Sequence, residues 1–578
     1  MGACNATNGT LNPNNPFASL NENALLFGSL PDLRQHTGTR SRVYRLATGI
    51  NGTFGEDWDY SVNALGMVND LRRSFDGYVY IQHLLDVLKD GSYNFVNPMS
   101  NSKAVLDYLA PHLDSFARSE MYQIDANLSH DFVELPGGPL QVAVGGSIRK
   151  ESVNSPSANP DANGPTQRYF EINAFGSVGS RWVESPYFEI KAPILTSLNL
   201  DLSGRYDNYS SGQHSFSPKA GVVFTPIRQI TFRGAVSKGF RIPSFGEASA
   251  LPTTGFVPVV PATLPAAYLA QYSNPGTTCT ATTLANCSAY LQNATGEQSI
   301  ANPNLKPEKS RNISAGVDIK PIRGLKFSVD YFNIKKTNAI TAAPFSAALN
   351  AYYNGQPIPA GYTVTPQAPD PNHPNALPLV GVVGAPFINA NTVETDGIDL
   401  AATMTFRFAN GWSLTSMADV EYIHKLNTLF PDGHVERYAG TLGNFNLTAG
   451  TGTPRWKGSW QNTLELGEKG SITATAYYTA GYNLSADDQG GGRCTDPVNA
   501  PGLGSGIQAC NTRRFIDVDL TGQINVAKAF TLYANVMNLF DAKAPLDTVT
   551  YGGYLYNPVV AEAGAIGRAF RIGGRFKF

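Results

Sequence analysis

Charge is scarce in this chain of 578 residues, because Asp, Glu, Lys and Arg together make up 15% of it, against roughly 25% in soluble proteins. The net charge of −2 and the lack of a concentrated cationic patch argue against nucleic acid as a partner. No stretch approaches the roughly 18 consecutive apolar residues of a transmembrane helix, which excludes such helices. The amino-terminal residues lack a basic region followed by an apolar run, so they form no secretory signal.

Motifs of catalysis and metal binding are missing as well. The chain has no G-x-S-x-G, C-x-x-C or H-E-x-x-H pattern and no Gly-Lys pair of a phosphate loop, and its eight histidines are scattered. Possible ligands gather at Asp432, His434 and Glu436 and at Asp487 and Asp488, but neither spacing matches a cation cage. We therefore predict that these are solvated loop residues, that the protein is not an enzyme, and that it has neither a metal site nor a cofactor.

Cysteine is also rare, with five in the chain, but four of the five form two close pairs. Cys279 and Cys287 bracket CTATTLANC, and Cys494 and Cys510 bracket the Gly- and Pro-rich CTDPVNAPGLGSGIQAC. Both stretches are loop-like and lack the C-x-x-C unit of a zinc or redox site. We therefore predict two loop disulfides formed in an oxidising compartment. Unpaired loop thiols are the alternative, and Cys4 has no neighbour and no predicted role.

Glycine and aromatic residues are plentiful, at 56 glycines and 11% aromatics, and many segments alternate between apolar and polar residues. This alternation places apolar side chains on one face of a strand and polar side chains on the other. It predicts about seventeen strands between residue 43 and the end of the chain. The last is GRAFRIGGRFKF, in which apolar Phe570 and Ile572 alternate with cationic Arg571 and Arg575.

The connections between these strands alternate in length. Short turns such as 55–57 and 467–470 separate one set of neighbouring strands, and long loops such as 67–116 and 240–310 separate the other. Short turns at one end and long loops at the other are typical of an outer-membrane barrel. A propeller needs a fixed repeat period, and sandwich strands are shorter. The predicted fold class is all-β, a transmembrane antiparallel β-barrel with short periplasmic turns and long extracellular loops.

Three local sequences resemble motifs of TonB-dependent outer-membrane receptors. They are RGAVSKGFRIPSFGEAS at 233–249, NPNLKPEKSRNISAGVD at 302–318 and NVMNLFDAKAP at 535–545, and the terminal aromatic residue suits the last strand of that family as an assembly signal. Pro243 cannot donate to a sheet ladder, so the strand before it ends near Arg241, and we predict that the motifs are structural edges of loops. The motif residues are Gly239, Phe240, Arg241, Pro243, Asn302, Pro303, Leu305, Pro307, Glu308, Asn538, Leu539, Phe540 and Phe578.

The resemblance implies a barrel of 22 strands with an N-terminal plug, opened by an inner-membrane energy source. About seventeen strands and no plug are recognised in this chain. We therefore expect an N-terminally truncated receptor, with an extracellular loop-like segment at 1–42 and a partial barrel at 43–578. The implied partners are a TonB-type energy-transducing complex acting through the plug, the barrel-assembly machinery, outer-membrane lipid and a small-molecule or chelate ligand.

The function expected from the resemblance is binding and active import of a scarce ligand across the bacterial outer membrane. A siderophore-iron chelate is the first expectation for the ligand, with cobalamin or an oligosaccharide next. A passive porin and a secreted β-rich adhesin are the alternatives. Aromatic loop residues provide rigid amphipathic area for any of these ligands, and the candidate ligand contacts are Phe345, Tyr352, Tyr353 and Tyr362.

A helical pattern at 102–116 is the other feature of the long loops. Its apolar residues Val105, Leu106, Leu109 and Leu113 share one face. We expect this helix to pack on its own loop, and a lid over the ligand is the alternative.

Overall fold

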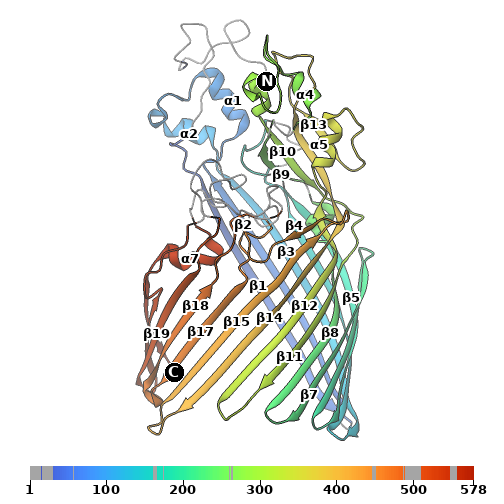
Figure 1. The fold of residues 1–578 in the computed structure, drawn as a ribbon, viewed down its shortest axis with the longest axis vertical. Coiled ribbons are helices and arrows are strands. Elements are labelled where there is room, and N and C mark those ends of the chain that lie inside the picture. Colours follow the sequence, from blue (N-terminus) through green and yellow to red (C-terminus); the bar gives the residue numbers. More distant parts are fainter. Residues whose placement is uncertain are drawn as a thin grey trace.

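The computed structural model describes residues 15, 30–55, 58–159, 166–173, 175–250, 252–259, 261, 264–444, 451–485, 487, 510–546 and 556–577. Within these residues seventeen strands form an antiparallel wall, in which each wall strand pairs with the next wall strand along the chain (Figure 1). They are β1 (His36–Phe54), β2 (Trp58–Asp76), β3 (Leu113–Leu135), β4 (Gly138–Ser155), β5 (Ser177–Leu195), β6 (Leu198–Tyr209), β7 (His214–Ile227), β8 (Ile230–Arg241), β11 (Glu308–Ile319), β12 (Leu325–Ala342), β14 (Val380–Arg407), β15 (Ser413–Leu429), β17 (Trp456–Glu465), β18 (Gly470–Thr479), β19 (Phe515–Ala527), β20 (Phe530–Met537) and β21 (Ala569–Phe576). This number of wall strands agrees with the sequence prediction.

The two faces of the wall differ in chemistry, as the alternation predicts. Directly paired residues of antiparallel strands share a face, so Asp330, Asp399, Glu421 and Lys457 of four successive strands form one polar row. Apolar residues of β14 such as Leu400 point to the other face and stay exposed to the surroundings. The polar face therefore lines the lumen, and the apolar face is the outside that meets lipid.

The two ends of the wall also differ. Short turns join β1 to β2, β3 to β4 and the later pairs at one end, where Gly324 and Gly411 adopt positive φ values of 86° and 83°. Helices gather at the other end, above the long strands (Figure 1). The α-helices are α1 (Ile81–Asp90), α2 (Lys103–Leu109), α3 (Phe245–Ser249), α4 (Ala266–Ala270), α5 (Ser346–Tyr353) and α7 (Pro558–Ile566). Of the 3₁₀-helices, η2 (Pro98–Ser100), η5 (Leu284–Asn286) and η6 (Ala289–Gln292) lie in the long loops, and η7 (Gly467–Lys469) forms a short turn.

Two long loops build a second, smaller sheet above the wall, which the sequence did not predict. We call it the upper sheet; it contains β9 (Thr253–Pro258), β10 (Ala294–Ile300), β13 (Thr363–Pro366) and the first residues of β14. Strand β10 runs parallel to β14, with Gly296 opposite Val382. A further short strand, β16 (Val435–Arg437), pairs with the end of β15. The first residues of β14 belong to the upper sheet and its later residues belong to the wall, so β14 joins the long loops to the wall.

Several strands are longer than the alternation predicts. Strand β1 begins at His36, before the predicted start at residue 43, and β14 has 28 residues. Above the membrane both faces of a strand meet water, so the apolar alternation disappears while the backbone ladder continues. The predicted boundary between a loop at 1–42 and a barrel from residue 43 therefore falls inside β1.

The predicted helix at 102–116 is shorter in the structure. Helix α2 starts after Ser102, whose Oγ accepts a hydrogen bond from the Val105 amide. It ends at Leu109, two residues before Pro111, and β3 begins at Leu113. Leu109 is buried with Val87 and Tyr93 in a small core between α1 and α2. The helix thus packs on its own loop.

The two terminal strands of the wall have one neighbour each within the described residues. Strand β1 pairs with β2, and β21 pairs with β20. Nearly every residue of both strands is exposed, on both faces, and the exposed fraction reaches 75% at Leu46 of β1 and 81% at Ile572 of β21. These strands therefore present the free backbone edges of the wall.

Candidate functional site

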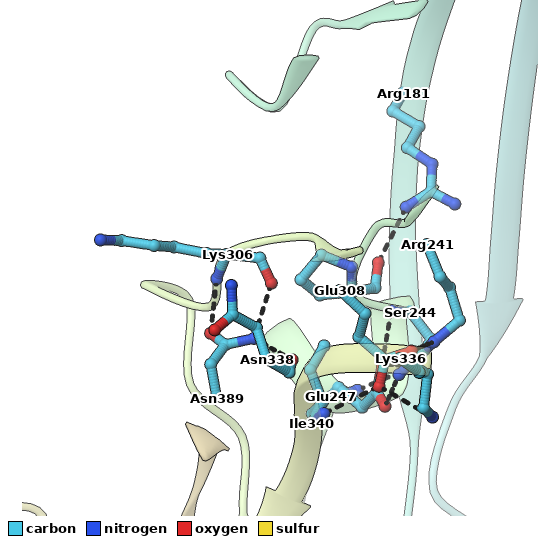
Figure 2. Close-up of polar contacts among 11 residues, drawn as sticks. Arg181, Arg241, Ser244, Glu247, Lys306, Glu308, Lys336, Asn338, Ile340 and Asn389 are labelled. Atoms are coloured by element: carbon cyan, nitrogen blue, oxygen red, sulfur yellow. Dashed lines mark hydrogen bonds and ion pairs between the residues drawn. The ribbon is translucent and has the colours of Figure 1, made fainter. Parts of the chain in front are cut away.

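The end of β8 carries an ion network, which we call the rim network, where the wall meets the extracellular loops (Figure 2). Pro243 ends β8 at Arg241, and the chain turns into α3. Ser244 caps α3 through its Oγ and the Glu247 amide, and Glu247 Oε2 accepts from the Ser244 amide at 2.7 Å. This capping box fixes Glu247 beside Arg241, whose two terminal nitrogens each lie 2.8 Å from its carboxylate oxygens.

Glu308 is the buried centre of the rim network. Its side chain is 3% exposed, and its Oε2 accepts from Arg241 Nε at 2.8 Å. Its Oε1 accepts from the Ile340 amide at 2.8 Å and from Lys336 Nζ at 3.4 Å. One carboxylate therefore ties β8, β11 and β12 together, and its burial is compensated by two cations and a backbone donor.

The segment before Glu308 is clamped by asparagine side chains (Figure 2). Asn389 accepts from the Lys306 amide at 2.7 Å and donates to the carbonyls of Lys306 and Asn338 at 2.8 and 3.0 Å. Asn302 donates to the Phe387 carbonyl at 2.8 Å. Pro303 and Pro307 lie in this strand-free lead-in, and Leu305 is buried. The motif therefore fastens the incoming loop to β12 and β14.

Arg181 of β5 supports the same corner, although β6 and β7 lie between β5 and β8 in the wall. Its guanidinium donates to Glu151 Oε2 at 2.9 Å and to the Pro243 carbonyl at 3.2 Å. It also lies 4.5 Å from the ring centre of Phe245 and 5.6 Å from that of Tyr209, which is within cation–π range. The sequence alone did not single out Arg181, because its partners Glu151 and Pro243 are 30 and 62 residues away.

The remaining motif residues also have structural roles. Gly239 faces Ser310, whose Oγ would lie 2.9 Å from an added Cβ, and Phe240 packs beside Tyr209 and Ile242. Asn538 is completely buried with φ of 48° and bonds the Ala542 amide and the Ala542 and Ala563 carbonyls.

The two residues after Asn538 differ from each other. The Leu539 amide donates to the Val518 carbonyl, while Phe540 is 72% exposed. The NLF segment thus joins the end of β20 to the loop that carries α7. Phe578 lies outside the described residues.

A tyrosine-rich core lies above the rim network, beside the upper sheet. Tyr268, Tyr272 and Leu291 are buried there together with Cys279, which forms a disulfide with Cys287. Burial raises the pKa of Tyr272 to about 12, so its hydroxyl remains a donor, bonded to the Leu377 carbonyl at 2.6 Å. The pairing of Cys494 with Cys510 stays a prediction, because Cys494 lies outside the described residues.

The four predicted ligand aromatics belong to this folded loop region. Phe345 is the N-cap residue of helix α5, and Tyr352 and Tyr353 are its last two residues. Their side chains and that of Tyr362 pack around buried Val380 and Val383. The hydroxyl of Tyr352 donates to the Pro378 carbonyl at 2.9 Å, and that of Tyr362 to the Pro344 carbonyl at 3.2 Å. The structure thus brings these residues together as supports of the loop, and their contact with a ligand stays a prediction.

Three polar side chains, those of Ser288, Asp370 and His373, also connect the two long loops. Ser288 Oγ donates to Asp370 Oδ2 at 2.6 Å, and His373 Nδ1 lies 2.9 Å from the same oxygen. His373 Nε2 lies 3.0 Å from the Ser273 carbonyl, so both ring nitrogens face acceptors. The hydrogen bond to Ser273 and then Asp370 raise the pKa of His373. Because a carbonyl occupies Nε2, this Ser–Asp–His chain is structural and offers no catalytic base.

Below the rim network the lumen is lined by charges of both signs. Arg233 of β8 contacts Asp330 at 2.8 Å and Asp318 at 3.3 Å. Arg233 and Asp330 border a cavity of about 720 Å³, large enough for a small ligand. Its other charged lining residues are Asp59, Asp131, Glu189, Lys191, Asp201 and Lys219.

Within the described residues no three His, Cys, Asp or Glu side chains gather to hold a metal ion. Among the helices of the described residues, none is long and apolar enough to cross a membrane.

The chain is similar to known proteins in family and in fold. The family model described as TonB dependent receptor-like, beta-barrel matches residues 5–539. A sequence search of curated proteins gave no match. The siderophore receptor PirA from Acinetobacter baumannii has a TM-score of 0.57 at 12% identity, with 94% of this chain and 63% of that chain covered.

Two other solved structures have similar scores. A variant of the ferric enterobactin receptor PfeA from Pseudomonas aeruginosa has a TM-score of 0.55 at 14% identity, with 93% of this chain and 62% of that chain covered. The RagAB peptide transporter has a TM-score of 0.56 at 11% identity, with coverages of 94% and 62%. At these identities the likeness is one of fold. The chain spans 62% to 63% of the length of these three structures.

Proposed function

This chain belongs to the TonB-dependent receptor-like β-barrel family and is an outer-membrane protein, and from this premise we propose that it forms the ligand-binding wall and loops of a receptor that actively imports a scarce ligand. The observation that carries the proposal is the folded loop region at the extracellular end of the wall. The upper sheet, the tyrosine-rich core and a disulfide stand at the extracellular end of the lumen, and a charged cavity of about 720 Å³ lies in the same lumen nearer the short turns.

We propose an iron–siderophore chelate as the ligand class. Two of the solved structures with this fold are named as a siderophore receptor and a ferric enterobactin receptor, which supports the proposal by analogy of fold. The third is named as a peptide transporter, so the same architecture serves other cargo. The ligand must therefore be tested directly.

We propose further that the wall is continued by additional strands and a plug, through which a TonB-type complex supplies energy. The exposed free edges of β1 and β21 support this proposal, since an unpaired backbone edge is unfavourable in hydrocarbon. Under this proposal the chain contributes capture and passage, and the energy-transducing contact lies in the plug. The proposed role is transport without catalysis.

The test is uptake by intact cells that express the gene from its native locus. Radiolabelled iron bound to a catecholate or hydroxamate siderophore is offered with and without an uncoupler of the proton gradient. Active import predicts saturable uptake that stops with the uncoupler and is absent from a deletion strain. Uptake that continues with the uncoupler supports a passive porin instead, and uptake of cobalamin or a peptide without iron chelate identifies another ligand class.

A further inference from the structure

Four arginines gather on the outer face of the wall, at the extracellular ends of the first three strands. Arg40 lies opposite Arg72, and Arg42 lies opposite Asp70, which in turn lies opposite Arg118. These positions share the face of Leu46, the lipid-facing side, because side chains alternate along a strand. The arginines border a concavity of about 690 Å³ on β1–β4. We call this group the outer arginine cluster.

Cationic charge is in excess within this cluster. Arg72 pairs with Asp114 at 2.6 Å, and Arg118 pairs with Glu120 at 2.8 Å and with Asp70 at 3.6 Å. Arg40 and Arg42 make no ion pair within the described part of the chain. The cluster therefore has two guanidinium groups available to an anion.

An apolar groove of about 800 Å³ lies directly below the cluster on the same face. Its floor consists of small residues, and its sides consist mainly of large exposed apolar ones. Thr48 and Glu184, whose carboxylate accepts from Asn208 at 3.4 Å, also border it. The floor residues are Ala64, Gly66, Ala126 and Gly146, and the side residues are Leu46, Tyr122, Ile124, Ile148, Trp182 and Pro186. Lys150, whose Nζ lies 5.8 Å from the Trp182 ring centre, stands between groove and cluster.

The height of the cluster on the wall places it at a membrane surface. Phe54, Trp58 and Phe132 form an aromatic group at the short-turn end of the same strands. From Phe54 to Arg42 the strand has twelve steps, which rise about 30 Å at the usual strand tilt. This is the thickness of the hydrocarbon layer, roughly 30 Å. The groove thus lies among acyl chains, and the arginines lie at the headgroups of the outer leaflet.

We propose that this surface is a binding site for one phosphorylated, acylated lipid of the outer leaflet. Arg40 and Arg42 bind phosphate of the headgroup, because a guanidinium matches phosphate with two parallel hydrogen bonds. An acyl chain fills the groove over Gly66 and Gly146. A soluble anion would use only the cluster, and an apolar ligand only the groove, whereas such a lipid satisfies both. The proposal depends on the outer-membrane location and not on which ligand the receptor imports.

The experiment uses the purified full chain in detergent and counts bound lipid by native mass spectrometry. The probes are bisphosphorylated lipid A and the same lipid after removal of its phosphates. The first should bind one molecule per chain, and the second should bind about 10- to 30-fold more weakly, as expected for the loss of two arginine contacts at a membrane surface. Inorganic phosphate should not displace the lipid.

Variants then locate the site. Arg40→Gln combined with Arg42→Gln should reduce lipid A affinity about 10- to 30-fold. Arg45→Gln is the matched control, since Arg45 lies on the same strand but on the lumen face, and it should change nothing. Gly66→Leu should also weaken binding by occupying the groove. Its Cβ finds ordinary contact, with Tyr122 Cδ1 at 3.5 Å, and retained heat-modifiable mobility on a gel checks the fold of every variant.

Three results would each overturn the proposal. They are equal binding of the phosphorylated and dephosphorylated lipids, displacement of the lipid by inorganic phosphate, and wild-type affinity in the double arginine variant. Unchanged binding by Gly66→Leu would remove the groove from the site. If the double arginine variant does not fold, the comparison of the two lipids on the wild-type chain still tests the proposal.

Discussion

Arg241 Nε and Glu308 Oε2 lie 2.8 Å apart and join residues 67 positions apart in the chain. Their exposures differ: the Glu308 side chain is 3% exposed and that of Arg241 45%. Arg241 reaches Glu308 on one side and Glu247 on the other, so a single guanidinium links the end of β8, helix α3 and the start of β11. The motifs at 233–249 and 302–318, which are separate in the sequence, therefore meet in one ion network that connects the wall to the loops.

Replacing Glu308 by Ala should loosen the loops while the wall persists. The change leaves Lys336 and the Ile340 amide without their buried acceptor. Loss of one member of a buried ion group costs about 3 to 5 kcal/mol, and the partial exposure of Arg241 lowers our expectation to about 2 kcal/mol. Limited proteolysis of 242–307 in the folded protein measures the effect.

Glu468→Ala is the matched control for that change. Glu468 belongs to η7 at the opposite end of the wall and makes no ion pair in the part of the chain that the structure describes. It should leave loop cleavage at the wild-type rate. Equal cleavage of the Glu308 and Glu468 variants would show that the rim network does not hold the loops.

Arg181→Lys should weaken the same corner although the charge is kept. A lysine ammonium cannot donate to both Glu151 and Pro243 while lying flat against the Phe245 ring. We expect a loss of about 1 kcal/mol, seen as faster hydrogen exchange of the amides in 242–250. Arg228→Lys, in the short turn between β7 and β8, is the control. Exchange at the wild-type rate in the Arg181 variant would contradict this role.

The loop region should lose stability as pH rises above neutrality. The bond to the Ser273 carbonyl and the Asp370 carboxylate raise the pKa of His373 above its ordinary 6.5. The stabilisation is therefore fully present below pH 6.5 and is lost as pH rises through the raised pKa. Hydrogen exchange of 284–292 at a series of pH values, corrected for the intrinsic exchange rate, measures it.

His373→Gln is the control for this pH dependence. Glutamine keeps a donor but does not titrate, so loop protection should become independent of pH in the neutral to alkaline range. A pH profile that is the same in both proteins would assign the effect to another group.

Removing the Cys279–Cys287 disulfide should loosen the tyrosine-rich core. The two residues are eight positions apart, and closing a loop of this size is worth about 2 to 3 kcal/mol in the chain-entropy model. The double change to serine should speed proteolysis within 273–292, and Cys4→Ser should not. Peptide mapping without reductant should also link Cys494 to Cys510, and free thiols at those positions would refute that pairing.

Much of the fold could be predicted from local patterns. Alternation along the chain gave the number of wall strands, and Pro243 marked the end of β8, because a residue without an amide proton cannot continue a ladder. The disulfide partners Cys279 and Cys287 are also close in sequence. Each of these signals acts over a few residues, so no tertiary information is needed to read it.

The candidate site was less accessible to sequence reasoning. Ligand contact by Tyr352 and Tyr362 stays a prediction, and the structure adds that their hydroxyls donate to backbone carbonyls of their own loop. Composition marks such residues as aromatic and loop-borne, and only packing decides whether they face inward or outward. No local sequence pattern marks Ser288 or His373 as partners. Ser288 bonds Asp370 across 82 residues, and His373 contacts the same carboxylate.

The sequence by itself determined an outer-membrane wall of alternating strands, short turns at one end and long loops at the other, because lipid on one face and water on the other impose a period of two. Only the tertiary structure decided that Glu308 is the buried centre of the rim network, that the loops fold into an upper sheet, and that Arg40 and Arg42 stand above an apolar groove. Those features depend on register between strands and on contacts between distant segments, which no local pattern encodes.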